Sequence, residues 1–159
     1  MYLTTHAGGT KPELNRAIVR AGMDGFDASA IVTGLKTPCG IVYEFKSGRI
    51  YWADDTTKKI QSSDAAGADV RTIVTLSNGP LGLALYGKKI YFGYYWSDVV
   101  QSMSKAGGDI RTVYTAAFTN IRNFVVPDWN APTNRTNHCL KHSCSNVCVL
   151  TATSFRCLG

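Results

Sequence analysis

Short runs of β-branched and aromatic residues alternate with turn residues along most of the chain. In one stretch, four such runs are bounded by glycine, aspartate, asparagine or serine. This pattern is typical of short strands joined by tight turns. No apolar stripe at helical spacing is sustained anywhere, so we expect an all-β protein. The four runs are Gly40–Phe45, Arg49–Asp54, Lys59–Asp64 and Arg71–Thr75.

The same order of runs recurs with a period of about 40 residues. Tyr51 and Tyr91 are 40 residues apart, and the small-residue turns that end at Gly25, Gly67 and Gly108 are spaced by 42 and 41. Four strands in such a period form one blade of a β-propeller, a small antiparallel sheet that buries its faces against its neighbours. The runs of the later unit are Leu81–Leu85, Lys89–Phe92, Val99–Met103 and Arg111–Tyr114.

Incomplete units flank these two blades. The first has strands at Tyr2–Thr4, Arg16–Arg20 and Ala30–Val32 but no preceding inner strand. The loop after its first strand, which contains residues 7–12, is some seven residues longer than in the other units. Near the other end, Asn123–Val126 is predicted to be one more inner strand. The strands together make about three blades.

Four of the five cysteines fall within the last 21 residues. A segment this small has no room for a hydrophobic core, so the clustering predicts disulfides and an oxidising compartment. A zinc site that also uses His138 and His142 is the alternative, but the cysteine spacing lacks the paired CxxC or HxxxH pattern of zinc modules. The clustered residues are Cys139, Cys144, Cys148 and Cys157, and Cys39 stands apart.

The formal net charge of +6 favours encounters with acidic surfaces such as sulfated glycans or acidic proteins. The basic residues are scattered, with Lys58-Lys59 and Lys88-Lys89 the densest pairs, so a nucleic-acid module is not indicated. The sequence contains no run of about 18 apolar residues, the length needed to span a membrane. Residues 1–6 also lack a charged leader followed by an apolar stretch. We therefore expect a longer parent chain to supply the signal peptide and any membrane segment.

Residues Tyr51–Asp54, which read YWAD, and Tyr2–Thr5, which read YLTT, resemble the YWTD motif of propellers in the low-density lipoprotein receptor family. Tyr91 keeps only the tyrosine of that motif. The resemblance implies a six-bladed ring, of which this chain would form about half. The remaining propeller half would lie in the parent chain, whereas a homodimer that completes the ring by strand exchange is the alternative.

The cysteine region resembles the EGF-like module that follows these propellers. The resemblance implies the disulfides Cys139–Cys148 and Cys144–Cys157, with the last two cysteines of the module missing. No acidic pattern precedes Cys139, so a calcium-binding variety is not indicated. We expect blades over residues 1–129, a linker over 130–137 and a partial, disulfide-bonded EGF-like module over 138–159. Asn134 lies in an Asn-Arg-Thr sequon, a candidate glycosylation site.

Loops that join strand two to strand three, and one blade to the next, should emerge on the same face of a propeller. This face is the candidate ligand-binding surface, since exposed tyrosine and tryptophan are enriched at binding hot spots. The alternative is that these aromatic residues pack between blades. The candidate residues are Tyr94, Tyr95, Trp96, Asp98 and Lys58.

The motif residues themselves should be structural. Tyr51, Trp52 and Tyr91 are expected to hold blades together, and Asp54 to accept hydrogen bonds from backbone or from an arginine. Cys39 is expected to lie in a turn that enters an inner strand. It should be a free thiol, either buried and inert or available as a reactive or intermolecular link. A pH switch built on His6, His138 and His142 is a further hypothesis.

The resemblance implies an extracellular, ligand-binding segment of an endocytic receptor related to the lipoprotein receptors. A signalling co-receptor and a basement-membrane propeller protein are the alternatives. A metal-dependent lactonase is the alternative from another class, but the predicted inner strands offer mainly apolar residues, with Glu44 and Asn123 as polar candidates. We expect no enzyme, cofactor or metal, because no catalytic fingerprint appears.

Overall fold

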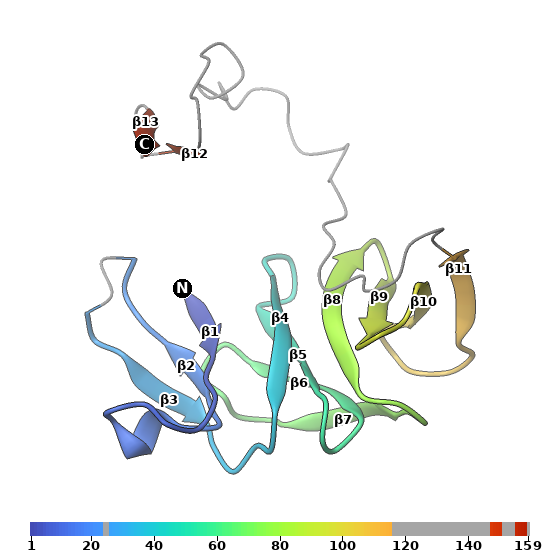
Figure 1. Ribbon diagram of the computed structural model, residues 1–159, viewed down its shortest axis with the longest axis horizontal. Coiled ribbons are helices and arrows are strands. Elements are labelled where there is room, and N and C mark those ends of the chain that lie inside the picture. Colours follow the sequence, from blue (N-terminus) through green and yellow to red (C-terminus); the bar gives the residue numbers. More distant parts are fainter. Residues whose placement is uncertain (24–25, 116–146, 151–154, 159) are drawn as a thin grey trace. The chain divides into compact units, whose positions relative to one another are not determined.

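The computed structural model describes residues 1–23, 26–115, 147–150 and 155–158. The chain divides into two units, Met1–Val126 and Pro127–Gly159, and each is described by itself. Three antiparallel sheets make up the described part of the first unit (Figure 1). Each sheet corresponds to one of the units predicted from the sequence, so the all-β, blade-type fold is confirmed.

The strands follow one another in simple meanders, with neighbours in the chain paired in the sheet. The first blade has three strands and the second and third have four each. The first blade contains β1 (Tyr2–Thr4), β2 (Ile18–Arg20) and β3 (Ser29–Val32). The second contains β4 (Pro38–Glu44), β5 (Arg49–Asp54), β6 (Lys59–Asp64) and β7 (Arg71–Thr75). The third contains β8 (Pro80–Tyr86), β9 (Lys89–Tyr94), β10 (Val99–Ser104) and β11 (Arg111–Thr115).

The first strands of the three blades, β1, β4 and β8, lie side by side (Figure 1). A glycine allows the closest approach between two of them. A Cβ atom built at Gly40 in β4 would lie 2.5 Å from the Leu81 carbonyl oxygen in β8. Any side chain at this position would therefore force the inner strands of the second and third blades apart.

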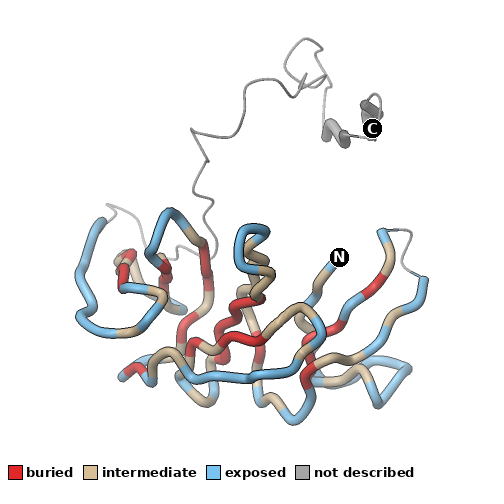
Figure 2. The backbone as a smooth tube through the Cα atoms, turned by 180° about the vertical axis from the view of Figure 1, so that it is seen from behind, coloured by how far each residue is buried: buried red, intermediate tan, exposed pale blue. Residues whose placement is uncertain are grey.

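The apolar residues fill the two spaces between blades, and burial is highest along the middles of the strands (Figure 2). Strand β5 contributes side chains to both spaces, because successive side chains of a strand point to opposite faces of the sheet. Ile50 and Trp52 pack toward the first blade, whereas Tyr51 packs toward the third. This explains why nearly every residue of β5 is buried.

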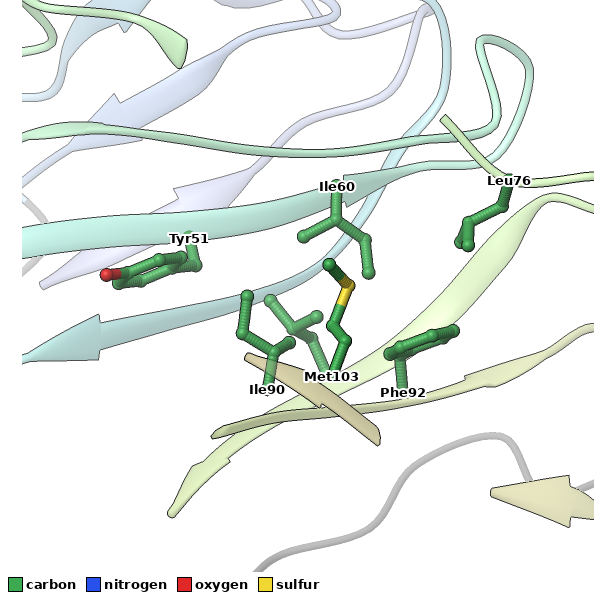
Figure 3. Packing of buried hydrophobic residues seen from close by; sticks show 7 residues of the cluster. Tyr51, Ile60, Leu76, Ile90, Phe92 and Met103 are labelled. Atoms are coloured by element: carbon green, nitrogen blue, oxygen red, sulfur yellow. The ribbon is translucent and has the colours of Figure 1, made fainter. Parts of the chain in front are cut away.

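The larger buried cluster lies between the second and third blades (Figure 3). Ile60 from β6 and Met103 from β10 point toward one another across this space. Each such side chain stabilises the fold by roughly 1.5–3 kcal/mol relative to an exposed position. The cluster consists of Tyr51, Ile60, Leu76, Leu83, Ile90, Phe92 and Met103.

The long loop between β1 and β2 contains a short 3-10 helix, η1 (Pro12–Leu14), which the sequence did not predict. The Thr5 hydroxyl anchors this loop by donating to the Leu14 carbonyl oxygen, and the Ala17 N–H donates to Thr5 Oγ1 at 3.2 Å. A proline at the first helical position suits such a turn, since its missing N–H would have no partner there.

The described part of the second unit is a hairpin of β12 (Val147–Leu150) and β13 (Phe155–Leu158). Its register places the backbone of Cys148 opposite that of Cys157. Both predicted disulfides involve Cys139 or Cys144, which lie outside the described residues, as do Asn134, the linker over 130–137, the predicted closing strand Asn123–Val126, His138 and His142. The described ranges contain no helix with the length and apolarity that a bilayer crossing requires.

Candidate ligand-binding face

Five connecting segments emerge at one end of the strands, and we call their surface the loop face. They are the segment before β2, the linker before β4, the turn before β6, the linker before β8 and the turn before β10 (Figure 1). The loop face holds two adjoining cavities. The segments comprise residues 5–17, 33–37, 55–58, 76–79 and 95–98.

The inner cavity has a volume of about 570 Å³ and lies over the inner strands. All three blades contribute to its mainly apolar lining. The first blade supplies Thr4 and the loop residue His6, the second supplies Ile41, and the third supplies Leu83. Further lining residues are Thr37, Cys39, Gly40, Asp55, Leu81, Gly82 and Tyr95.

The outer cavity, of about 490 Å³, lies between the second and third blades and has a mainly polar lining. It shares Asp55 and Tyr95 with the inner cavity, so these two residues stand at the junction. The full lining of the outer cavity is Asp55, Asn78, Gly79, Tyr94, Tyr95, Trp96 and Ser97.

Of the three consecutive aromatic residues of the third blade, one packs against neighbouring side chains and two are exposed. Tyr94 is half-buried at the end of β9, where its ring meets Phe92 edge-on and its hydroxyl donates to Gln101 Oε1 at 2.5 Å. Burial raises the pKa of the Tyr94 hydroxyl. Tyr95 and Trp96 instead lie in the turn, 44% and 70% exposed. Tyr94 is therefore a packing residue, whereas the other two present aromatic surface on the loop face.

The exposed pair has a defined geometry. The ring centroids of Tyr95 and Trp96 are 5.1 Å apart at an interplanar angle of 67°, an edge-to-face contact. Trp96 has a φ of 58°, in the left-handed region that bulky residues seldom adopt. Lys58, in the corresponding turn of the second blade, has nearly the same φ of 57°, so this conformation belongs to the turn.

The other two predicted binding residues, Asp98 and Lys58, belong to the loop face but not to the cavity linings. Asp98 is half-buried just before β10, and Lys58 is exposed in the turn before β6. Neither lines the inner or the outer cavity. The sequence did not single out Asp55, although its place in the turn after the YWAD motif marked it as a loop residue.

Asp54 lies at the end of β5, and the partners of its carboxylate are backbone N–H groups. The carboxylate is 1% exposed. Its Oδ2 accepts from the N–H groups of Lys36 and Thr37 at 2.9 and 3.3 Å, and its Oδ1 accepts from the Thr57 N–H at 3.0 Å. Asp54 thus fixes both the linker between the first two blades and the turn that carries Asp55.

The remaining motif residues differ in position. Tyr51 and Trp52 belong to the buried clusters between blades, as described above. Burial raises the pKa of the Tyr51 hydroxyl, and the nearby Glu44 carboxylate adds to that rise. Tyr91 is half-buried and belongs to neither buried cluster.

Cys39 is a free thiol inside β4, whereas the sequence placed it in a turn before the strand. The half-buried sulfhydryl donates to the Thr37 carbonyl oxygen at 3.3 Å. Burial raises the pKa of this thiol, and the Asp55 carboxylate raises it further by repelling the thiolate. The described residues contain no group of three or more histidine, cysteine or acidic side chains that could hold a metal ion.

Comparisons with solved structures show the fold. The nidogen/laminin complex has a chain that matches 65% of this chain and 42% of its own length, with a TM-score of 0.57 and 24% identity. A gluconolactonase from Xanthomonas campestris matches 70% of this chain and 46% of its own, with a TM-score of 0.56 and 17% identity.

Comparisons with curated sequences cover about half of the chain. Low-density lipoprotein receptor-related protein 5 of Homo sapiens is 35% identical over 77 residues, which are 47% of this chain and 5% of the relative. The vitellogenin receptor of Solenopsis invicta is 29% identical over 76 residues, which are 47% of this chain and 4% of the receptor. This chain thus spans only a small part of these relatives, and no protein-family model matches it. Over about half of its length the chain is homologous to a low-density lipoprotein receptor-related protein and to a vitellogenin receptor, and its first unit has the fold of β-propeller blades.

Proposed function

We propose that this chain is part of an extracellular receptor ectodomain and that its loop face binds a protein ligand. The observation that carries the proposal is the exposed, edge-to-face pair of Tyr95 and Trp96 beside two adjoining cavities. Rigid aromatic side chains provide large contact area at low entropic cost.

The parent protein that we propose is an endocytic receptor. Its support is the homology to a low-density lipoprotein receptor-related protein and to a vitellogenin receptor. A signalling co-receptor stays an alternative, since the homology does not separate these classes. A basement-membrane propeller protein is also an alternative, because the nidogen/laminin complex contains a chain of similar fold.

We propose a role in binding and not in catalysis. The similarity to a gluconolactonase is at 17% identity and concerns the fold, which hosts many unrelated functions. The inner cavity is lined by His6, Cys39 and Asp55, but burial and the Asp55 carboxylate both raise the pKa of the Cys39 thiol, which opposes its use as a nucleophile.

Binding measurements with the full chain test the proposal. The immobilised chain is exposed to a panel of purified secreted and matrix proteins that includes laminin. At least one should bind saturably, and the double substitution Tyr95→Ala/Trp96→Ala should weaken that binding about ten-fold or more.

Phe45→Ala is the matched control for this experiment, because Phe45 is 90% exposed in the turn after β4, at the opposite end of the strands. The control should bind like the unchanged chain. Absence of saturable binding across the panel, or equal binding by the double variant, would contradict the proposed function.

A further inference from the structure

We infer that the loop face recognises a basic side chain of its ligand, an arginine or a lysine, at Asp55 and the exposed aromatic pair. The inference rests on the proposed function and adds the chemistry of the bound group. It also extends to the residue beside that basic side chain, which should be apolar.

Asp55 is the single acidic side chain in the lining of either cavity, and no lysine or arginine lines them among the described residues. Its carboxylate is half-buried and has no ion-pair partner within the described part of the chain. A carboxylate that is partly desolvated and lacks a counter-charge attracts a cation more strongly than one in open water. The site is therefore locally negative.

The backbone that carries the Asp55 carboxylate is held at two points of the turn. Asp54 holds the turn through the Thr57 N–H, and the Asp55 N–H donates to the Thr37 carbonyl oxygen at 2.9 Å. A Cβ atom built at Gly79 would lie 1.8 Å from Asp55 Oδ1. The glycine in the linker before β8 thus makes room for the carboxylate at the junction of the cavities.

The aromatic pair supplies the second element of cation recognition. Tyr95 and Trp96 line the same outer cavity as Asp55, and both rings are exposed. An arginine or lysine head group beside such rings is attracted by their negative π-faces, and tryptophan is the most effective of the aromatic residues. Carboxylate and aromatic surface together select a cation over a neutral group of the same shape.

The lining of the inner cavity determines which type of residue the ligand should carry next to its basic side chain. It meets the outer cavity at Asp55 and Tyr95, and its floor is formed by apolar residues that include Ile41 and Leu83. A ligand segment that places its basic side chain in the outer cavity would place an adjacent side chain over this floor. Burial of that side chain is favourable only if it is apolar.

The net positive charge of the chain and the negative charge of Asp55 act at different distances from the surface. The net charge of +6 is scattered and governs the long-range encounter, which salt screens within about 10 Å at 0.1 M ionic strength. The cavities govern contact chemistry at distances of a few ångströms. A ligand with an acidic surface and one basic anchor side chain meets both requirements.

The test titrates small unlabelled peptides into the full chain, which is labelled with nitrogen-15. N-acetyl-leucyl-arginine amide is titrated while the indole N–H signal of Trp96, assigned by Trp96→Phe, is followed by NMR. N-acetyl-leucyl-citrulline amide has nearly the same shape without the charge. We expect a saturable shift with the arginine peptide and binding about five-fold or more weaker with the citrulline peptide.

Asp55→Asn should reduce the affinity for the arginine peptide to that for the citrulline peptide. Asp109→Asn, which neutralises an exposed carboxylate near the opposite end of the strands, should leave the preference unchanged. Absence of a saturable shift, equal binding of both peptides, or an undiminished preference in Asp55→Asn would overturn the inference. If the panel partner still depends on Tyr95 and Trp96 in that event, the proposed function stands without the inference.

Discussion

The Asp54 carboxylate at the end of β5 accepts a hydrogen bond from the backbone N–H of Lys36 at 2.9 Å. Lys36 lies in the linker between the first two blades, so this bond ties a strand of one blade to the segment that enters it. The YWAD motif thus ends in a residue that joins blades and not in one that contacts a ligand.

Asp54→Asn should lower the free energy of unfolding by about 1–3 kcal/mol, because one of the two acceptor oxygens becomes an amide that cannot accept from the buried N–H groups. Urea denaturation followed by far-UV circular dichroism measures the change. Asp109→Asn is the matched substitution at an exposed position and should have little effect. An unchanged denaturation midpoint for Asp54→Asn would show that the carboxylate does not hold the linker.

Gly67→Ala should destabilise the chain more than Gly34→Ala. Both glycines have positive φ values, 86° and 75°, so alanine pays a backbone cost of about 1–2 kcal/mol at either position. A Cβ atom at Gly67 would in addition lie 2.0 Å from the Ile31 carbonyl oxygen of the first blade, whereas one at Gly34 would meet nothing within 4 Å.

The extra cost at Gly67 should be about 1–3 kcal/mol, the usual penalty for overpacking. Thermal or urea unfolding of the two variants measures the difference directly. Equal destabilisation by the two substitutions would mean that the first and second blades are not in close contact at this position.

Glu44→Gln should remove an ion pair between the second and third blades. The Glu44 carboxylate accepts from Lys105 Nζ, and both side chains are largely buried. Burial raises the pKa of Glu44, but hydrogen bonds from Lys105 and Ser47 and the positive charge of Lys105 outweigh that effect and leave the pKa below its ordinary value.

A depressed pKa in the folded state gives a stabilisation that is present above the unfolded pKa of about 4.3 and is lost as the pH falls through the folded value. The substitution should therefore cost about 1 kcal/mol at pH 7 and progressively less below pH 4. Denaturation at several pH values checks this, with Glu13→Gln at an exposed glutamate as the control. A pH-independent difference from the unchanged chain would argue against the ion pair.

Cys39 should react slowly with iodoacetamide at pH 7.5, because burial and the Asp55 carboxylate raise the pKa of the thiol. Asp55→Asn removes the repulsion of the thiolate and should speed alkylation about two-fold or more. Peptide mass spectrometry locates and times the reaction, and Cys39→Ser supplies the blank. An unchanged rate in Asp55→Asn would place the carboxylate farther from the sulfur than the structure does.

The strands of the three blades were predictable because the 40-residue repeat combines strand-forming residues with turn residues at fixed positions. Every described strand of the first unit overlaps a run identified in the sequence. The 3-10 helix η1 was missed because three residues are too few for a hydrophobic period. Cys39 was placed in a turn because the extent of β4 depends on pairing with β5.

The candidate site was only partly predictable. The aromatic pair was found because tyrosine and tryptophan stand out in a turn, but Tyr94 could not be separated from Tyr95 without knowing where β9 ends. Asp55 was missed because its position depends on Gly79, a residue of the following linker that lies beside it only in the folded chain. Lys58 and Asp98 belong to the same loops but line neither cavity, which the order of residues in a loop does not reveal.

If the loop face is the binding surface, a bound ligand should protect its backbone amides from exchange with solvent. Hydrogen exchange measured by mass spectrometry, with and without the panel protein that binds most tightly, tests this directly. Bound ligand should slow exchange in residues 55–58 and 94–98 and leave residues 45–48 and 105–110, at the opposite end of the strands, unchanged. Protection confined to that opposite end would contradict the claim.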